Sequence, residues 1–126
     1  MLFVSFKSTL INYLLGQSTL MNLVGSRLYF ANPATVEFLA YPAATFLLAE
    51  GNDFLGIVRD FPMQAFTHSD QHFDEAHQVM DIIAIALDGV ILGNACAVRV
   101  TGNPTENYVI NPRLYNVNLP LHVTLL

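Results

Sequence analysis

Three histidines and two aspartates lie within ten residues in the middle of the chain, and their types could support metal chemistry. They are His68, Asp70, His72, Asp74 and His77. Imidazole and carboxylate groups are ligands for zinc and for non-haem metals. One hypothesis is therefore a small metal-binding module or metal-dependent enzyme that uses the region of His68, His72 and His77.

The spacing of these residues argues against such a site. On a helix, His72 and His77 are five positions apart, roughly 140° around the axis, whereas paired ligands need a spacing of four. His68 belongs to the end of the preceding strand and reaches His72 only through a turn. We favour a polar junction with a capping carboxylate at Asp70, and we expect no metal and no cofactor.

Other catalytic devices are not found in the sequence. There is no nucleophile elbow, no phosphate-binding glycine loop and no dinucleotide-binding glycine turn. The single cysteine, Cys96, lies in an apolar segment, where a buried thiol is inert. We therefore expect no catalytic residues and no enzymatic activity. His122 is expected to be solvated or at an interface.

The elements that position these residues follow from the hydrophobic pattern. Residues 8–24 predict two short helices interrupted at Gly16, with Ser18 as a cap and Gly25 at the exit. Residues 41–49 and 54–67 predict antiparallel strands joined by a turn at 50–53. Residues 95–101 and 115–125 predict two more strands, separated by a loop rich in Gly, Asn and Pro.

The clearest helix is predicted over residues 71–88, ending at Gly89. We expect an α+β fold: a mostly antiparallel four- to five-stranded sheet with two or three helices packed on one face.

The outer face of the predicted helix 71–88 carries Asp74, Gln78, Asp81 and Asp88, with Ile82 and Ile85 among them. The two isoleucines are either tolerated surface residues or a subunit contact. The acidic stripe is either a solvent-exposed face or the lining of a channel that faces another polyanion without binding it.

Composition limits the function classes. The chain has 126 residues, enough for one domain over residues 1–126; 53% are hydrophobic and only 12% are charged. So little charge indicates that much of the surface meets protein. The net charge of −5 argues against a general nucleic-acid binder. We expect neither a signal peptide nor a membrane span, and synthesis in the cytoplasm.

Several segments together resemble a known family. They are Leu14-Leu15-Gly16, the stretch Leu20–Tyr29, Tyr41–Phe46, Gln64–Thr67, Glu75-Ala76, Ala86–Gly89 and the closing strand from Tyr115. In this order they resemble the tail-terminator (tail-completion, head-to-tail joining) proteins of siphophages. The sequence departs from the family where Tyr41 precedes the proline, at Pro62 and in the loop 102–112.

The resemblance implies a structural virion protein, made in the host cytoplasm and located in the tail or neck. It implies a homo-oligomer, a hexameric ring in the virion that can be a monomer when isolated. The ring would end tail-tube polymerisation and join the tail to the head connector, and DNA would pass through it without specific binding. Another neck or head-closure connector protein is the alternative within the same class.

Overall fold

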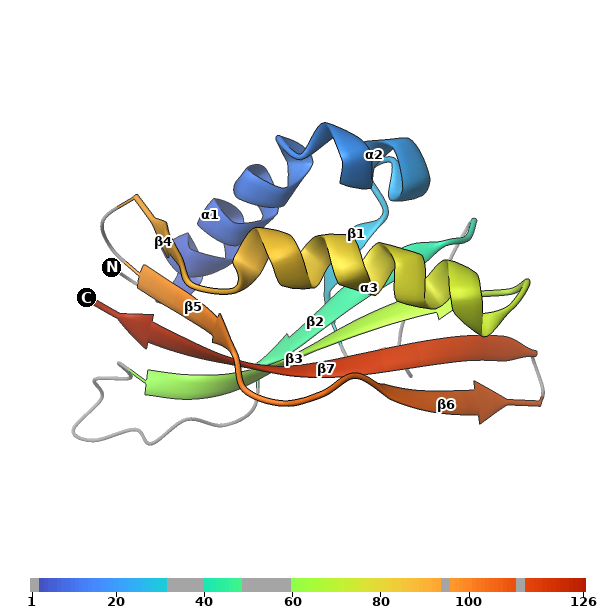
Figure 1. Ribbon diagram of the computed structural model, residues 1–126. Helices are drawn as coiled ribbons and strands as arrows, with labels where there is room; N and C mark the ends of the chain where they lie inside the picture. Colours follow the sequence, from blue (N-terminus) through green and yellow to red (C-terminus); the bar gives the residue numbers. More distant parts are fainter. Residues whose placement is uncertain (1–2, 32–39, 49–59, 94–95, 111–112) are drawn as a thin grey trace.

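The computed structural model describes residues 3–31, 40–48, 60–93, 96–110 and 113–126, with side chains from residue 6 onward. Figure 1 shows three helices lying above one twisted sheet. The predicted turn at 50–53 and the start of the predicted strand 54–67 lie outside the described residues. The elements are α1 (Phe3–Leu15), α2 (Ser18–Val24), β1 (Leu28–Phe30), β2 (Ala43–Leu48), β3 (Asp60–Ser69), α3 (Phe73–Leu87), β4 (Val90–Leu92), β5 (Cys96–Val100), β6 (Thr105–Val109) and β7 (Leu114–Leu125).

The sheet is mixed and has seven strands, in the order β1-β2-β3-β7-β5-β4, with β6 also paired to β7. β1 runs parallel to β2, and every other pair is antiparallel. The prediction of a sheet of four to five strands is therefore wrong, because the sheet has seven strands and is mixed, with one parallel pair; the fold is α+β. β1 and β4 have three residues each, too few for a period-two pattern.

β7 is the central strand, and the alternation predicted for it is confirmed. Val117, Leu119, Leu121, Val123 and Leu125 are buried toward the helices. The residues between them point to the opposite side of the sheet, which we call the open face because no helix covers it (Figure 1). One edge of β7 pairs with β3 over ten positions, from Asp60↔Thr124 to Ser69↔Tyr115.

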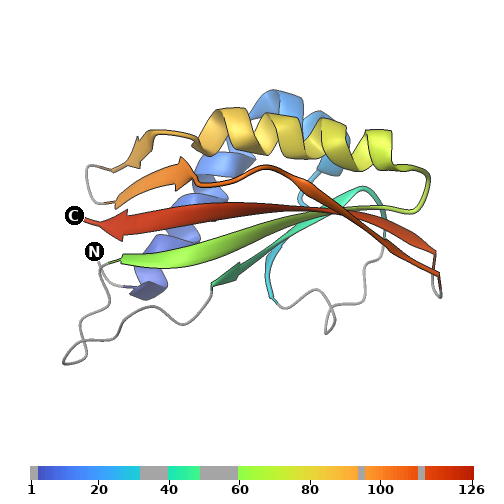
Figure 2. The same ribbon diagram turned by 60° about the horizontal axis from the view of Figure 1, so that its bottom comes forward.

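The other edge of β7 is shared by β5 and β6. Val100 pairs with Leu121 and Thr105 with Asn118, so residues 101–104 lie opposite only residues 119–120. A Cβ atom on Gly102 would lie 2.7 Å from Cγ of Pro120, so any larger residue would displace the proline ring. Beyond this bulge, β6 and the start of β7 form the hairpin arm (residues 105–110 and 113–118), which reaches one end of the molecule in Figure 2.

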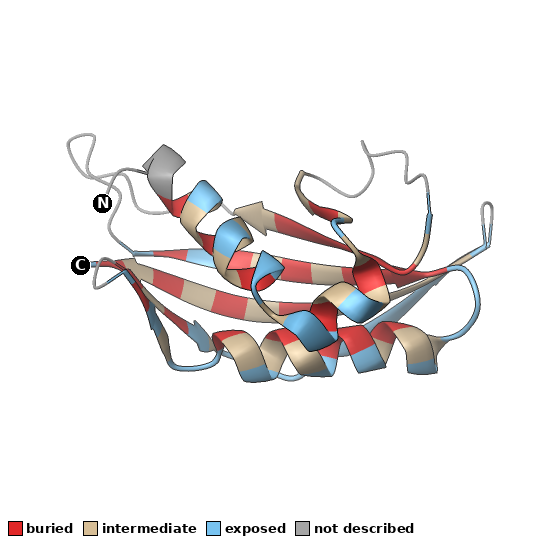
Figure 3. Cartoon of the chain, turned by 90° about the horizontal axis from the view of Figure 1, so that it is seen from above, coloured by how far each residue is buried: buried red, intermediate tan, exposed pale blue. Residues whose placement is uncertain are grey.

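The core lies between the helices and the sheet, and Figure 3 shows the buried positions of α1 and α3 facing the strands. The Phe6 ring meets Phe61 edge-on at 5.5 Å and Phe30 at 6.2 Å. One hydroxyl joins the sheet to α3, and another joins α1 to α3. Thr67 Oγ1 donates to the Ala76 carbonyl at 2.7 Å, and Tyr13 Oη donates to the Ala86 carbonyl at 2.9 Å.

The two N-terminal helices separate at Gly16, as predicted, but Ser18 does not cap α2. Gln17 occupies the cap position without a side-chain hydrogen bond, and Ser18 is the first helical residue. Gly25 ends α2 with a φ of 57°, a conformation that favours glycine. Arg27 then joins α2 to the start of β2, because Nε donates to the Pro42 carbonyl at 2.9 Å and Nη2 to the Leu23 carbonyl at 3.2 Å.

α3 starts two residues later than predicted, and its cap is His72 rather than Asp70. His72 Nδ1 accepts a hydrogen bond of 3.0 Å from the backbone N–H of Glu75. Ser69, one residue before Asp70, accepts from the backbone N–H groups of Gln71 and His72, so the turn is satisfied without the aspartate. Gly89 follows the helix with a φ of 77°, which confirms the predicted exit.

Two isoleucines on α3 allow a matched test of this packing. Ile83 is fully buried and Ile85 is 83% exposed. Ile83→Ala should lower the free energy of unfolding by about 2–5 kcal/mol, because it leaves a cavity beneath the helix. Ile85→Ala, the control on the same helix, should change it by less than about 0.5 kcal/mol. Urea unfolding of dilute protein measures both, and equal losses would contradict the orientation of α3.

Candidate assembly interface

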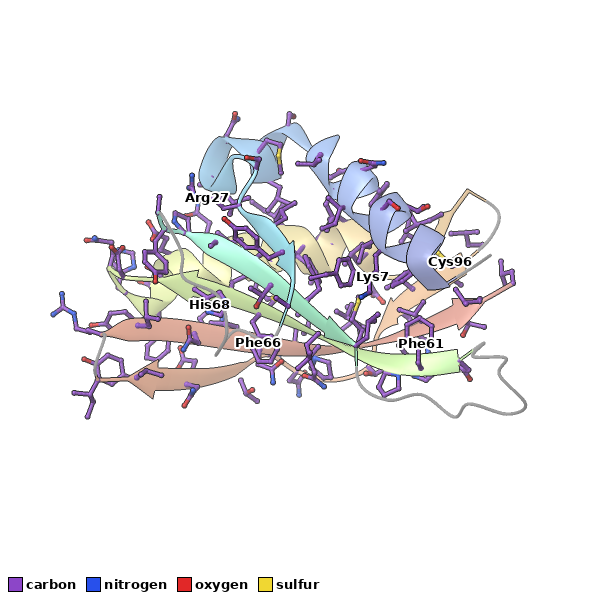
Figure 4. The ribbon with its side chains drawn as sticks, turned by 180° about the vertical axis from the view of Figure 1, so that it is seen from behind. Lys7, Arg27, Phe61, Phe66, His68 and Cys96 are labelled. Carbon is purple, nitrogen blue, oxygen red and sulfur yellow. The ribbon has the colours of Figure 1, made fainter. Side chains whose placement is uncertain are left out.

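The structure places His68 on the open face of the sheet, on β3 (Figure 4), where it is nevertheless buried. His68 is 2% exposed. Its Nδ1 lies 2.7 Å from Asn116 Oδ1 and its Nε2 lies 2.9 Å from Thr45 Oγ1. Because the amide oxygen only accepts, Nδ1 carries the proton and Nε2 accepts from the threonine hydroxyl. Burial lowers the pKa of His68, and the bond to Asn116 opposes this more weakly. His68 is therefore a neutral imidazole that links β2, β3 and β7.

The other two histidines of the motif have different partners. His72 caps α3, and His77 Nε2 lies 2.9 Å from Glu106 Oε2 on β6. Within the described ranges, no group of three His, Cys, Asp or Glu side chains is placed to hold a metal ion. The geometry therefore gives the metal hypothesis based on His68, His72 and His77 no support.

A polar cluster on the open face joins residues far apart in sequence. His122 Nε2 is hydrogen-bonded to Asp60 Oδ1, and Thr124 Oγ1 donates to the same oxygen at 3.1 Å. The bond from His122 is the main cause of the lowered pKa of Asp60, and Arg99 contributes a smaller electrostatic effect. Sequence spacing does not indicate this cluster, because β3 and β7 meet only through the sheet. Asp60 and Arg99 are the only Asp, Glu, Lys or Arg residues on the open face of the described strands.

Cys96 lies in the core at the start of β5, where Figure 4 labels it. The thiol is fully buried. Burial raises its pKa, with weaker opposing effects from the Leu92 backbone and the N-terminal charge. A high pKa and a buried position both disfavour the reactive thiolate.

The outer face of α3 carries an exposed isoleucine surrounded by acids. Ile85 is 83% exposed, whereas Ile82 packs partly against the core. At helical spacing, the exposed Asp74, Gln78 and Asp81 lie on the same side as Ile85. Asp88, the first residue after the helix, is also exposed, and its Oδ1 accepts a hydrogen bond of 3.0 Å from the Val100 backbone N–H. We call Ile85, Asp74, Gln78, Asp81 and Asp88 the helix patch. The roles predicted for Ile82 and Ile85 in a subunit contact, and for Asp74, Asp81 and Asp88 in a channel or solvent face, stay predictions.

A second exposed apolar group lies at the end of the hairpin arm. Tyr108 is 45% exposed and Ile110 is 80% exposed, and Arg113 is also exposed. We call these three residues the tip patch. The Tyr108 ring packs on Tyr115 at 5.0 Å, and Tyr115 packs on Phe73 at 5.1 Å, so the arm is held to the first turn of α3.

The sequence pattern does not indicate the tip patch, because residues 102–112 have the composition of a loop. The available signal is Ile110, a large apolar residue in a stretch of Gly, Asn and Pro. Further exposed apolar side chains are Leu15, Ile91 and Leu126. No helix in the described part of the chain is long and apolar enough to cross a bilayer.

Comparisons with known proteins identify a fold and no family. No family model matches the chain, and no curated protein is similar to it in sequence. One similar solved structure is a chain of a particle described as "Virion of native gene transfer agent (GTA) particle". The TM-score is 0.64 at 17% sequence identity, over 90% of this chain and 89% of that chain. At this identity the similarity shows a shared fold.

The environment of His68 predicts a pH dependence of stability. Because burial lowers the pKa of His68 in the folded state, the unfolded chain takes up the proton first as the pH falls below about 6.5. The free energy of unfolding should therefore fall with decreasing pH, by at most about 1.4 kcal/mol per pH unit, until the folded-state pKa is reached.

His68→Gln should remove this part of the pH dependence. The measurement is urea unfolding of the wild type and the variant between pH 7.5 and 5. The difference between their free energies of unfolding at each pH cancels the contributions of the other titrating groups. Asn22→Ala, which changes an exposed side chain that does not titrate, should keep the pH dependence. If His68→Gln has the same pH profile as the wild type, the imidazole is not held neutral by the fold.

Proposed function

We propose that this chain is a structural virion protein of a tailed phage or phage-like particle. In this proposal it forms a ring at the head-proximal end of the tail, ends polymerisation of the tail tube and joins the tail to the head connector. The observation that carries the proposal is the likeness to a chain of a gene transfer agent virion over nine-tenths of both chains. The order of segments that resembles tail terminators supports the tail position.

The surface of the chain supports an assembly role. Only 12% of its residues are charged, and the most exposed large apolar side chains among the described residues lie on different elements, Ile85 on α3 and Ile110 at the hairpin arm. A ring of identical subunits needs two different contact surfaces on each subunit. A lone monomer gains nothing from exposing either isoleucine.

The charge of the chain also suits a passage for DNA. The net charge is −5, and the exposed basic residues of the described part are scattered over separate elements. A ring with clustered arginines and lysines would retain the passing duplex, whereas a neutral or acidic wall would not. The DNA in this proposal therefore passes through the ring without specific binding.

The proposed role predicts a particular assembly defect. When the gene for this chain is disabled in the phage that encodes it, tails should polymerise without control of length and remain unattached to heads. Electron microscopy of the lysate measures the tail-length distribution and the fraction of tails joined to heads. The wild-type gene supplied from a plasmid should restore both, as should an Asn22→Ala variant, which changes an exposed polar side chain on α2 outside both exposed patches.

Different defects separate the related roles. Tails of normal length beside open or detached heads would indicate a role in head closure and overturn the terminator role. Complete particles with normal tails would overturn a structural role in the neck altogether.

A further inference from the structure

We infer that the tip patch of one copy docks on the helix patch of a second copy, so that the same contact repeats from subunit to subunit. This inference deepens the proposed function and rests on it for closure of the contacts into a ring. The occupant of the helix patch is thus the Tyr108, Ile110 and Arg113 surface of an identical chain.

The two patches match in apolar character. Ile85 and Ile110 are the most exposed large hydrophobic side chains of the described residues, at 83% and 80%. Each is a single apolar residue on an otherwise polar surface. Contact between them removes both from water, and the half-exposed Tyr108 ring adds a flat apolar surface beside Ile110.

The two patches also match in charge. Asp81 and Asp88 lie about one turn to either side of Ile85, although Asp88 Oδ1 also accepts a hydrogen bond from the Val100 backbone N–H. No Lys or Arg occurs between Arg59 and Arg99. Arg113 in the tip patch is exposed, and no hydrogen bond or ion pair joins it to another residue in the described part of the chain. Arg27, in contrast, already donates to two backbone carbonyls. A docked tip patch brings the Arg113 guanidinium to the acidic surroundings of Ile85, which is electrostatic complementarity.

The patches of one chain cannot meet each other. The hairpin arm is fixed to the start of α3 by the Tyr115–Phe73 contact and by the pair His77–Glu106. Ile85 lies twelve residues beyond Phe73, roughly 18 Å further along the helix axis. Ile85, Asp81 and Asp88 therefore lie toward the end of α3 opposite to the tip patch, the arrangement that a head-to-tail contact requires, whereas Asp74 lies in the first turn beside the arm.

A two-fold contact is disfavoured by charge. A helix patch placed against another helix patch brings Asp81 and Asp88 toward the same residues of the second copy. A tip patch against a tip patch likewise opposes two Arg113 side chains. Repulsion in both symmetric arrangements leaves the tip-to-helix arrangement as the complementary one.

Cysteine cross-linking tests the contact on the full chain. A short bismaleimide is added to the double variant Gln78→Cys/Asn107→Cys, which places thiols on α3 and on the hairpin arm and keeps both isoleucines, over a range of protein concentrations up to millimolar. We expect a ladder of covalent dimers, trimers and larger species, because the α3 thiol of each copy lies near the arm thiol of the next copy. Wild-type protein, whose Cys96 is buried, should stay monomeric on denaturing gels. Each single variant should give at least about tenfold less dimer.

Charge reversal tests the electrostatic part. Arg113→Glu added to the double cysteine variant should lower the cross-linked fraction by about tenfold, because a like charge then faces the aspartates. Arg99→Glu is the matched control: it reverses an exposed arginine outside both patches and should leave the ladder unchanged.

The outcomes are distinct. Cross-linked dimers from a single variant would show a two-fold contact and overturn the inference. The absence of a ladder at every protein concentration would also overturn it, because the helix patch would then face something else, such as DNA or another virion protein. An equal effect of the two arginine reversals would overturn the role of Arg113. A clear ladder combined with normal virions lacking the gene product would overturn the proposed function and leave the contact intact.

Discussion

The register of β7 is the constraint on which the rest of the sheet and α3 depend. This strand pairs with β3 on one edge and with both β5 and β6 on the other. A shift by one residue would turn its five buried aliphatic side chains to the open face and place asparagines and a histidine beneath α3. Hydrophobic burial therefore sets the register from the helix side.

Polar pairs on the open face specify the same register. His68 meets Asn116, and Asp60 meets His122 and Thr124, only when β3 and β7 are aligned as observed. The two sets of contacts lie near opposite ends of β3. Both faces of the sheet thus select one alignment, which fixes the base of the hairpin arm relative to α3.

The elements that the sequence predicts well are those with a long regular period. The 3.6-residue period between Phe73 and Leu87 predicts both the buried face of α3 and the outward position of Ile85. The period of two in β7 does the same for that strand. The short strands β1 and β4 have no measurable period, and β6 is polar, so its strand conformation comes from its pairing with β7.

Local caps and surface patches are less predictable because they depend on neighbours distant in the chain. A helical wheel places Ile82 and Ile85 on one polar face, but only packing shows that Ile82 is partly covered. Asp70 and His72 are both acceptable caps by residue type, and the hydrogen bonds of Ser69 decide between them. The tip patch depends on a hairpin that the composition of residues 102–112 conceals.

The close approach of Gly102 to Pro120 has a consequence for how this protein can vary. The arm leaves the sheet at the bulge that Gly102 allows, and the contacts of Tyr108, Tyr115 and Glu106 hold it against α3. The exposed side chain at position 110 has no part in these contacts, so a substitution there can alter the binding surface while the orientation of the arm is kept. A larger residue at position 102 would instead change the orientation of the arm and leave its surface residues unchanged.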